Sequence, residues 1–147
     1  TGGFCAFYLA DPGPAGGFGV FDSDRRAKPA LRALTDACRP VIVVGEPLPT
    51  SVGVGKVYEI AIHVVSDLHE SLRDGVVSAT IHHADGTTDV HRWGGDLEAD
   101  SVARIALLSV PALQPGALTV ELALTAVADD AENGEITAHS SVKTTVS

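Results

Sequence analysis

The sequence predicts a mainly β fold, an immunoglobulin-like antiparallel β-sandwich that follows a short βα segment. Residues 41–147 hold about seven short segments in which apolar and polar side chains alternate, at the spacing typical of such a sandwich. Turn signals rich in glycine, proline and aspartate separate these segments. The helical pattern lies before residue 41, so we expect the chain to divide into residues 1–40 and 41–147.

The first 21 residues are expected to form a strand and a loop. Phe4 to Ala10 is a nearly unbroken apolar run, which suits a strand buried on both faces. Asp11 and the Pro-Gly-Pro that follows it break this run. A glycine-rich loop then leads to a short apolar patch at residues 18–21.

A short helix is expected within residues 22–40. Pro29 suits its first turn, because the missing N–H of a proline costs little there. A side chain among residues 22–24 is expected to cap the helix start, and Arg39-Pro40 is expected to end the helix. The apolar stripe of this helix consists of Ala27, Leu31, Leu34 and Cys38.

The strands of the sandwich are predicted from alternation with a period of two. The clearest pattern runs from Leu118 to Ala126, and residues 68–74 are expected to form a polar turn. The predicted strands are 41–44, 57–65, 77–82, 88–93, 102–110, 118–126 and 136–146. The side chains expected to point into the core are Ile60, Ile62, Ile81, Ile105, Leu107, Val120, Leu122 and Leu124.

Composition and charge narrow the functions to consider. The 147 residues are 45% hydrophobic, which is typical of a globular chain. Residues 1–46 are neutral overall, so the rest of the chain carries the whole formal charge of −9. An acidic surface argues against nucleic acid or an anionic membrane as a partner. The sequence shows no apolar run long enough to span a bilayer and leaves the compartment open, with a soluble cytoplasmic chain slightly favoured.

Two compositional details bear on the origin of the chain and on its thiols. The sequence contains no methionine, so Thr1 is not expected to be a natural start, and we expect a processed product or a piece of a longer protein. Cys5 and Cys38 both lie before residue 41. Two small buried thiols are favoured over a disulfide, because nothing else in the sequence indicates a disulfide scaffold.

One hairpin could bring metal ligands together. Asp85-Gly86 predicts a two-residue turn, which would place His82 opposite Asp89 and put His91 on the same face. These are suitable zinc ligands, but structural zinc usually needs four of them and only three converge here. The favoured interpretation is therefore a solvated sheet face, with no metal and no cofactor.

Trp93 and an acidic loop are the remaining binding candidates. The indole of Trp93 could stack on a sugar, although large aromatic side chains more often complete a sandwich core. Asp96, Glu98 and Asp100 could bind calcium, but they do not follow the EF-hand pattern, and a solvated acidic loop is favoured.

The motifs around the predicted helix resemble those of a known enzyme family. They are similar to the last βα unit of the barrel, and the module that follows it, in β-mannosidase-like members of glycoside hydrolase family 2. The matching segments are Thr1-Gly-Gly-Phe, Leu9-Ala-Asp-Pro-Gly-Pro, Val20-Phe-Asp, Arg26-Ala-Lys-Pro-Ala-Leu, Trp93-Gly-Gly-Asp and Ala99-Asp-Ser-Val-Ala-Arg.

This resemblance implies that the chain is a C-terminal fragment of a retaining glycosidase. Residues 1–40 would be the last strand, loop and helix of a TIM barrel, and residues 41–147 an Ig-like support for that barrel. The family places its two catalytic glutamates on earlier barrel strands, and residues 1–45 contain no glutamate. The fragment is therefore expected to hold no catalytic residue, and its partners would be the rest of the parent chain and that enzyme's carbohydrate substrate.

The resemblance also gives one candidate site residue. Asp11 stands where barrel active sites lie, at the end of the first predicted strand, and could contact or support the sugar in the whole enzyme. The alternative is that it caps a local turn. The apolar βα segment, separated from its barrel, could also pair with a second copy. As a different class of function, the sandwich could be an independent carbohydrate- or protein-binding module with Trp93 as its main contact.

Overall fold

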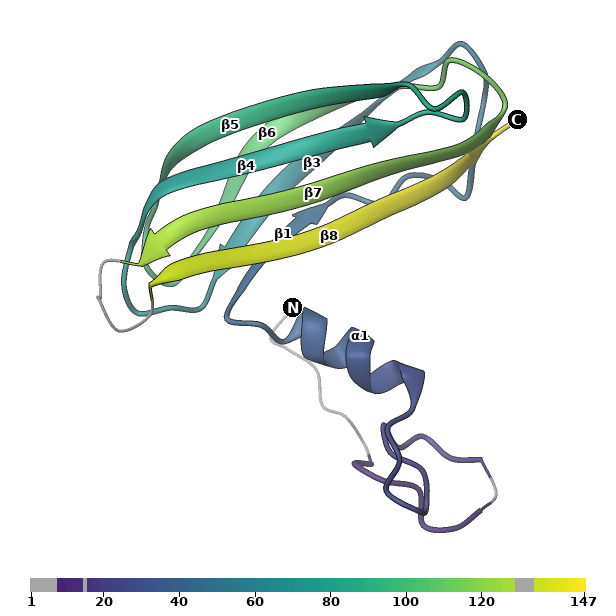
Figure 1. Ribbon diagram of the computed structural model, residues 1–147, viewed down its shortest axis with the longest axis vertical. Coiled ribbons are helices and arrows are strands. Elements are labelled where there is room, and N and C mark those ends of the chain that lie inside the picture. The colour runs from purple at the N-terminus through teal and green to yellow at the C-terminus, as the bar shows by residue number, and fades with distance from the viewer. Residues whose placement is uncertain (1–7, 15, 129–133) are drawn as a thin grey trace. The chain divides into compact units, whose positions relative to one another are not determined.

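The computed structural model describes residues 8–14, 16–128 and 134–147 (Figure 1). The chain divides into two compact units, Thr1–Arg39 and Pro40–Ser147. Unit 1 contains one helix, and unit 2 is built of β-strands. The predicted strand at Phe4–Ala10 lies outside the described residues except for its last three positions.

The strands of the structure lie in unit 2. One of them, β2, has two residues, too few for an alternating pattern to be recognised in the sequence. Leu72, expected in a turn, begins a strand and is completely buried. The strands are β1 (Val41–Gly45), β2 (Ser51–Val52), β3 (Val57–Ser66), β4 (Leu72–His82), β5 (Thr88–Leu97), β6 (Ser101–Pro111), β7 (Gly116–Ala128) and β8 (Glu135–Val146).

The strands form two sheets that pack as a sandwich (Figure 1). One sheet has the order β1-β3-β6, and the other has the order β2-β8-β7-β4-β5. Neighbouring strands are antiparallel, apart from the parallel pair of β2 with β8. The prediction of a mainly β, sandwich-like fold is therefore confirmed, with the short parallel β2 as an addition.

The core lies between the two sheets and follows the predicted alternation. Val77, Ala79 and Ile81 on β4 are buried, and so are the even-numbered residues of β7 from Leu118 to Ala128. Six of the predicted core side chains have exposures of 2% or less: Ile60, Ile62, Ile81, Val120, Leu122 and Leu124. Ile105 is partly buried and packs against this core.

Leu107 was expected to point inward, and that expectation is wrong. The register between β3 and β6 shifts at Ile62, whose partner is Ala106, while His63 pairs with Arg104. Ile105 is thus the extra residue of a β-bulge, and a bulge moves the following side chains to the other face. Leu107 is 56% exposed as a result, and the inward positions after the bulge are the even-numbered ones.

The hairpin between β4 and β5 also differs from the prediction by one residue. The N–H of His83 donates to the carbonyl of Thr87, and the N–H of Gly86 donates to the carbonyl of His83. The loop therefore has three residues, with Gly86 at a φ of +84°, the left-handed conformation that glycine adopts without strain. Asp85 Oδ1 accepts bonds from the hydroxyl and the N–H of Thr87, which hold this longer turn and lower the pKa of Asp85.

Unit 1 is organised around the helix α1 (Pro29–Ala37). Pro29 occupies its first turn as predicted, but the cap is the backbone of Lys28, without a side-chain bond. Asp22 instead accepts the N–H groups of Asp24 and Arg26 and closes a turn before the helix. Cys38, expected to be buried, is exposed, and Cys5 lies outside the described residues. Across the described residues, no helix is both long and apolar enough to cross a membrane.

Replacing Leu122 by alanine tests the core assignment. The Leu122 side chain is 1% exposed, so its truncation leaves a cavity between the sheets. We expect a loss of about 2–5 kcal/mol in the free energy of unfolding, measured by chemical denaturation. Leu107→Ala is the matched control in a strand of the other sheet, and its loss should stay below about 0.5 kcal/mol. Equal losses in the two variants would contradict both the core assignment and the bulge.

Candidate functional site

The three metal-ligand candidates of the β4–β5 hairpin do not converge. His82 pairs with Thr88, and Asp89 pairs with Ile81, so His82 points to the face opposite Asp89. Nε2 of His82 lies 3.2 Å from a carboxylate oxygen of Glu121 on β7, and Asp89 lies 3.0 Å from Nε2 of His83. The longer turn is the physical reason, because a register shift of one residue reverses which side chains share a face. Across the described residues, no cluster of three possible metal ligands occurs.

Asp96, predicted to begin an acidic loop, lies instead near the end of β5, and with the connection that follows it forms a structural corner. Asp96 accepts the backbone N–H of Asp74 at 3.1 Å and forms an ion pair with Arg73 at 3.2 Å. The N–H of Asp100 donates to the carbonyl of Leu68, so this corner is tied to the β3–β4 connection. These contacts satisfy the carboxylate of Asp96 and the backbone N–H of Asp100 without a bound ion.

Asp11, the candidate site residue, is the buried centre of the loop in unit 1. Its Oδ1 accepts the N–H of Gly19 at 2.7 Å, and its Oδ2 accepts Nζ of Lys28 at 2.8 Å. Nζ of Lys28 also donates to the carbonyl of Gly17 at 2.9 Å. A Cβ atom at Gly19 would lie 2.7 Å from Oδ1 of Asp11, so the loop closes this tightly only because glycine stands there. Asp11, at the start of the loop, thus binds both Gly19 near the end of the loop and Lys28, the residue before the helix.

The same contacts set the charge state of Asp11. The hydrogen bond from Lys28 is the largest influence, and with the N–H of Gly19 it holds the pKa of this carboxyl below its ordinary value of 3.8. The carboxylate is therefore ionised at neutral pH. Its side chain is 5% exposed, so in this conformation the loop and Lys28 surround it.

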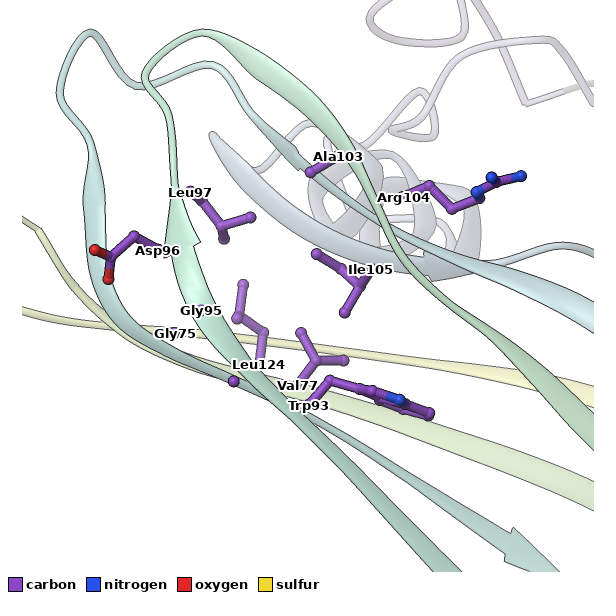
Figure 2. A pocket seen from close by; sticks show the side chains of 11 residues that line it. Gly75, Val77, Trp93, Gly95, Asp96, Leu97, Ala103, Arg104, Ile105 and Leu124 are labelled. Atoms are coloured by element: carbon purple, nitrogen blue, oxygen red, sulfur yellow. The ribbon is translucent and has the colours of Figure 1, made fainter.

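The open side of unit 2 carries a hollow of about 420 Å³ between β5 and β6. These are edge strands of different sheets, and we call the gap between their edges the seam. Figure 2 shows apolar side chains directed into the hollow and the side chains of Asp96 and Arg104 directed away from it. The apolar lining consists of Val77, Trp93, Leu97, Ala103, Ile105 and Leu124.

A pair of glycines creates this hollow. On the inward row of β5, Gly95 stands between Trp93 and Leu97, and it pairs with Gly75 of β4. A Cβ atom at Gly75 would meet the carbonyl oxygen of Gly95 at 2.5 Å, so close strand approach requires glycine at position 75. A Cβ atom at Gly95 would meet nothing within 4 Å, so that position faces open space.

A second hollow of about 440 Å³ lies further along the same strands. It is lined by Asp89 and His91 from β5 and by Ser109 and Pro111 from β6, with Val57 at the start of β3. The rings of His91 and Trp93 stack with centroids 6.1 Å apart and planes 10° from parallel. The two aromatic rings thus form a ridge between the two hollows of the seam.

Sequence reasoning found Trp93 but missed the site around it. Trp93 packs against the core, as the favoured interpretation expected, and it also lines a hollow. The available signal was Gly94-Gly95 within a strand pattern, because glycine inside a strand often marks close backbone approach. Its partner Gly75 lay between the predicted turn at 68–74 and the predicted strand at 77–82, so the glycine pair was not visible.

Comparisons with known proteins support the fold of unit 2. No protein-family model matches the chain, and no curated protein matches it. The CARDB domain of a Pyrococcus furiosus protein, crystallised with di-metal ions, is similar with a TM-score of 0.51 and 21% identity, over 73% of this chain and 85% of that one. Its solution structure gives a TM-score of 0.51 and 20% identity, over 73% and 94% of the two chains.

A sporulation control protein from Bacillus subtilis is a more distant likeness. It has a TM-score of 0.43 and 12% identity, over 74% of this chain and 49% of that one. At such identities the two similar CARDB structures show a shared β fold and nothing about activity.

The ion pair in unit 1 predicts a pH-dependent loop. Because the pKa of Asp11 is lowered on folding, its stabilising effect is complete well above pH 3.8 and is lost as the pH falls through the folded pKa. We expect the amide proton of Gly19, which donates to Asp11, to shift in NMR spectra with a midpoint below 3.8. Asp11→Asn should abolish this transition, whereas Asp24→Asn, at an exposed ion pair, should retain it. A midpoint at or above 3.8 would refute the assignment.

Proposed function

We propose that this chain is a non-catalytic C-terminal portion of a family 2 glycoside hydrolase of the β-mannosidase-like type, in which unit 2 supports a catalytic barrel. The observation that carries the proposal is the contrast between the two units. Unit 2 buries a continuous apolar core of its own. In unit 1, within the described residues, the buried positions are Asp11 and Gly19, neither of which is apolar.

The exposed side chains of unit 1 are those that a barrel would cover. Leu9 is 71% exposed, and Phe18 is 86% exposed. None of the residues of α1 is buried, although Leu31 and Leu34 lie on its apolar stripe. Large exposed apolar side chains on a small unit indicate a surface meant for another protein segment. In the proposed enzyme, residues 1–40 are the last βα unit of a TIM barrel, and neighbouring strands and helices cover this surface.

Asp11 acts in this proposal as a positioning residue. One of its oxygens accepts the N–H of Gly19 in its own loop and the other accepts Nζ of Lys28 before the helix, so the carboxylate is suited to fixing that loop at the end of the barrel strand. Hydrolysis with retention needs two carboxyl groups about 5–5.5 Å apart, one as acid and base and one as nucleophile. An ionised carboxylate bound to Lys28 can donate no proton, and the glutamates needed for the reaction would come from earlier barrel strands.

The seam of unit 2 suits a second candidate function, that of an independent binding module. Trp93 and the hollow beside it would suit an independent binding module, since ligand sites are concave and mostly apolar. The upstream sequence separates these functions. A barrel with two catalytic glutamates before residue 1 supports the glycosidase, and its absence leaves the binding module.

The activity test compares the chain with a longer protein that includes its natural upstream sequence. Chain 1–147 should release no phenol from aryl β-mannosides or aryl β-galactosides above the enzyme-free rate. The longer protein should hydrolyse one of them, with a rate that falls by about 10³-fold or more when either predicted catalytic glutamate is changed to glutamine.

Asp11 provides the control for this test. In the longer protein, Asp11→Asn should lower the catalytic rate while Asp24→Asn, with its exposed side chain, should leave it unchanged. Turnover by chain 1–147 that disappears with Asp11→Asn would overturn the proposal, because the chain would then contain its own catalytic centre.

A further inference from the structure

We propose that the seam between β5 and β6 is a docking groove for an extended peptide segment of a partner protein, which adds to the sheet at the free edge of β5. The segment would carry apolar side chains at alternate positions and lysine or arginine at its ends. This inference concerns unit 2 alone and does not depend on the glycosidase proposal.

The outer edge of β5 has no partner strand among the described residues. Within the described residues, β5 pairs only with β4, so one side of its backbone has free hydrogen-bonding groups. Natural edge strands are often protected by proline, charged side chains, inward-pointing charges, a bulge or short length. β5 has ten residues, contains no proline, and stays regular where its neighbour β4 carries the bulge, so its protecting features are the charges of Asp89, Arg92 and Asp96. β6, across the seam, is interrupted by its own bulge at Ile105 and ends at Pro111.

The arrangement of the two hollows suits an extended ligand. Both lie between the same two strands, one beside Asp89 and His91 and the other beside Gly95. Four to six residues of extended chain separate these positions, which is about 13–20 Å at 3.3 Å per residue. Side chains four residues apart in a strand point to the same face, so one extended segment can fill both hollows. A compact ligand would fill only one of them.

Gly95 leaves open space beside β5. Gly95 has no atom within 4 Å of the position that its Cβ would take, so an incoming side chain or backbone can come close to β5 there. Val57, which lines the second hollow, is 62% exposed in the chain alone, and Val90, on the outer face of the β5 edge, is 55% exposed. An added strand would cover both of them while its backbone pairs with β5. This is the pattern of β-strand addition, in which backbone bonds give affinity and side-chain pockets give selectivity.

Charge selects a cationic segment. Residues 47–147 carry the whole net charge of −9. Asp89 stands at one hollow with a half-exposed side chain, whereas Asp96, beside the other hollow, is already paired with Arg73. Arg104 is the one lysine or arginine among the residues that line them. A second copy of the chain would bring another −9 to this surface, and like charges oppose such pairing. A separate segment with lysine or arginine at its ends fits the same surface.

The test uses the full chain and a synthetic peptide with a fluorescein label. The probe is Lys-Thr-Val-Thr-Leu-Thr-Val-Thr-Lys, which places two valines four residues apart. A control peptide has proline in place of leucine and cannot continue the backbone pairing. Anisotropy should show saturable binding of the probe and at least tenfold weaker binding of the control. Emission from Trp93, the only tryptophan in the chain, should change with the same saturation.

Two neighbouring glycines give matched variants. Gly95→Leu places a side chain in the hollow. Gly94 also borders the hollow through its backbone, but it pairs with the outward-facing Val76, so Gly94→Leu places the same side chain on the opposite face of β5. A Cβ atom at Gly94 would lie 3.7 Å from its nearest neighbour, and neither glycine has a positive φ, so both variants should fold. We expect Gly95→Leu to raise the dissociation constant at least tenfold and Gly94→Leu to change it less than twofold. Circular dichroism of both variants checks the fold.

Three results would overturn the proposal. One is the absence of saturable binding at millimolar probe concentration. Another is equal affinity of Gly95→Leu and Gly94→Leu for the probe while both remain folded. The third is a dimer of the chain, detected by analytical ultracentrifugation, that Gly95→Leu dissociates, because the occupant of the seam would then be a second copy.

Discussion

The inward row of β7 is the packing on which the rest of unit 2 depends. β7 lies between β8 and β4 in the larger sheet, and its residues Leu118, Val120, Leu122 and Leu124 have exposures of 2% or less. Full burial of such a side chain contributes about 1.5–3 kcal/mol relative to exposure. This row fixes which residues of β4 point inward, because Val77, Ala79 and Ile81 are paired with residues of β7. The orientation of β5 follows in turn from its pairing with β4.

This dependence explains how much of the fold the sequence could predict. Burial on one face of a strand imposes a period of two, so the strand at 118–126 and most of the core were predictable from alternation alone. Departures from this period of two could not be predicted from the sequence. The extra residue at Ile105 is apolar like the three residues that follow it, and only the pairing of β6 with β3 shows which side chains point outward after it. The hairpin was ambiguous because Asp85-Gly86 suits both two-residue and three-residue loops.

The candidate sites were less predictable, because they depend on contacts distant in sequence. Asp11 was identifiable as a residue of interest, but its pairing with Lys28 is 17 positions away and has no local pattern. Trp93 was visible as a single large aromatic residue. The hollow beside it requires Gly75 and Gly95 to face each other across two strands, and that register could not be derived from the sequence. Alternation gives the direction of a side chain, whereas a cavity depends on which side chains are missing opposite each other.

The two glycines of the hollow differ in a way that bears on function. Gly75 is explained by structure, since any side chain there would collide with the backbone of β5. Gly95 has no such explanation, because its Cβ position is open and its backbone conformation suits other residues. An apolar side chain at that position would cover part of the exposed core, and covering such surface stabilises a fold by about 25 cal/mol per Å². A position that forgoes this gain beside a strand edge without a partner strand is typical of a site whose empty space has a use. The same reasoning makes Gly95, rather than the more conspicuous Trp93, the residue whose substitution most directly separates a binding role of the seam from a purely structural one.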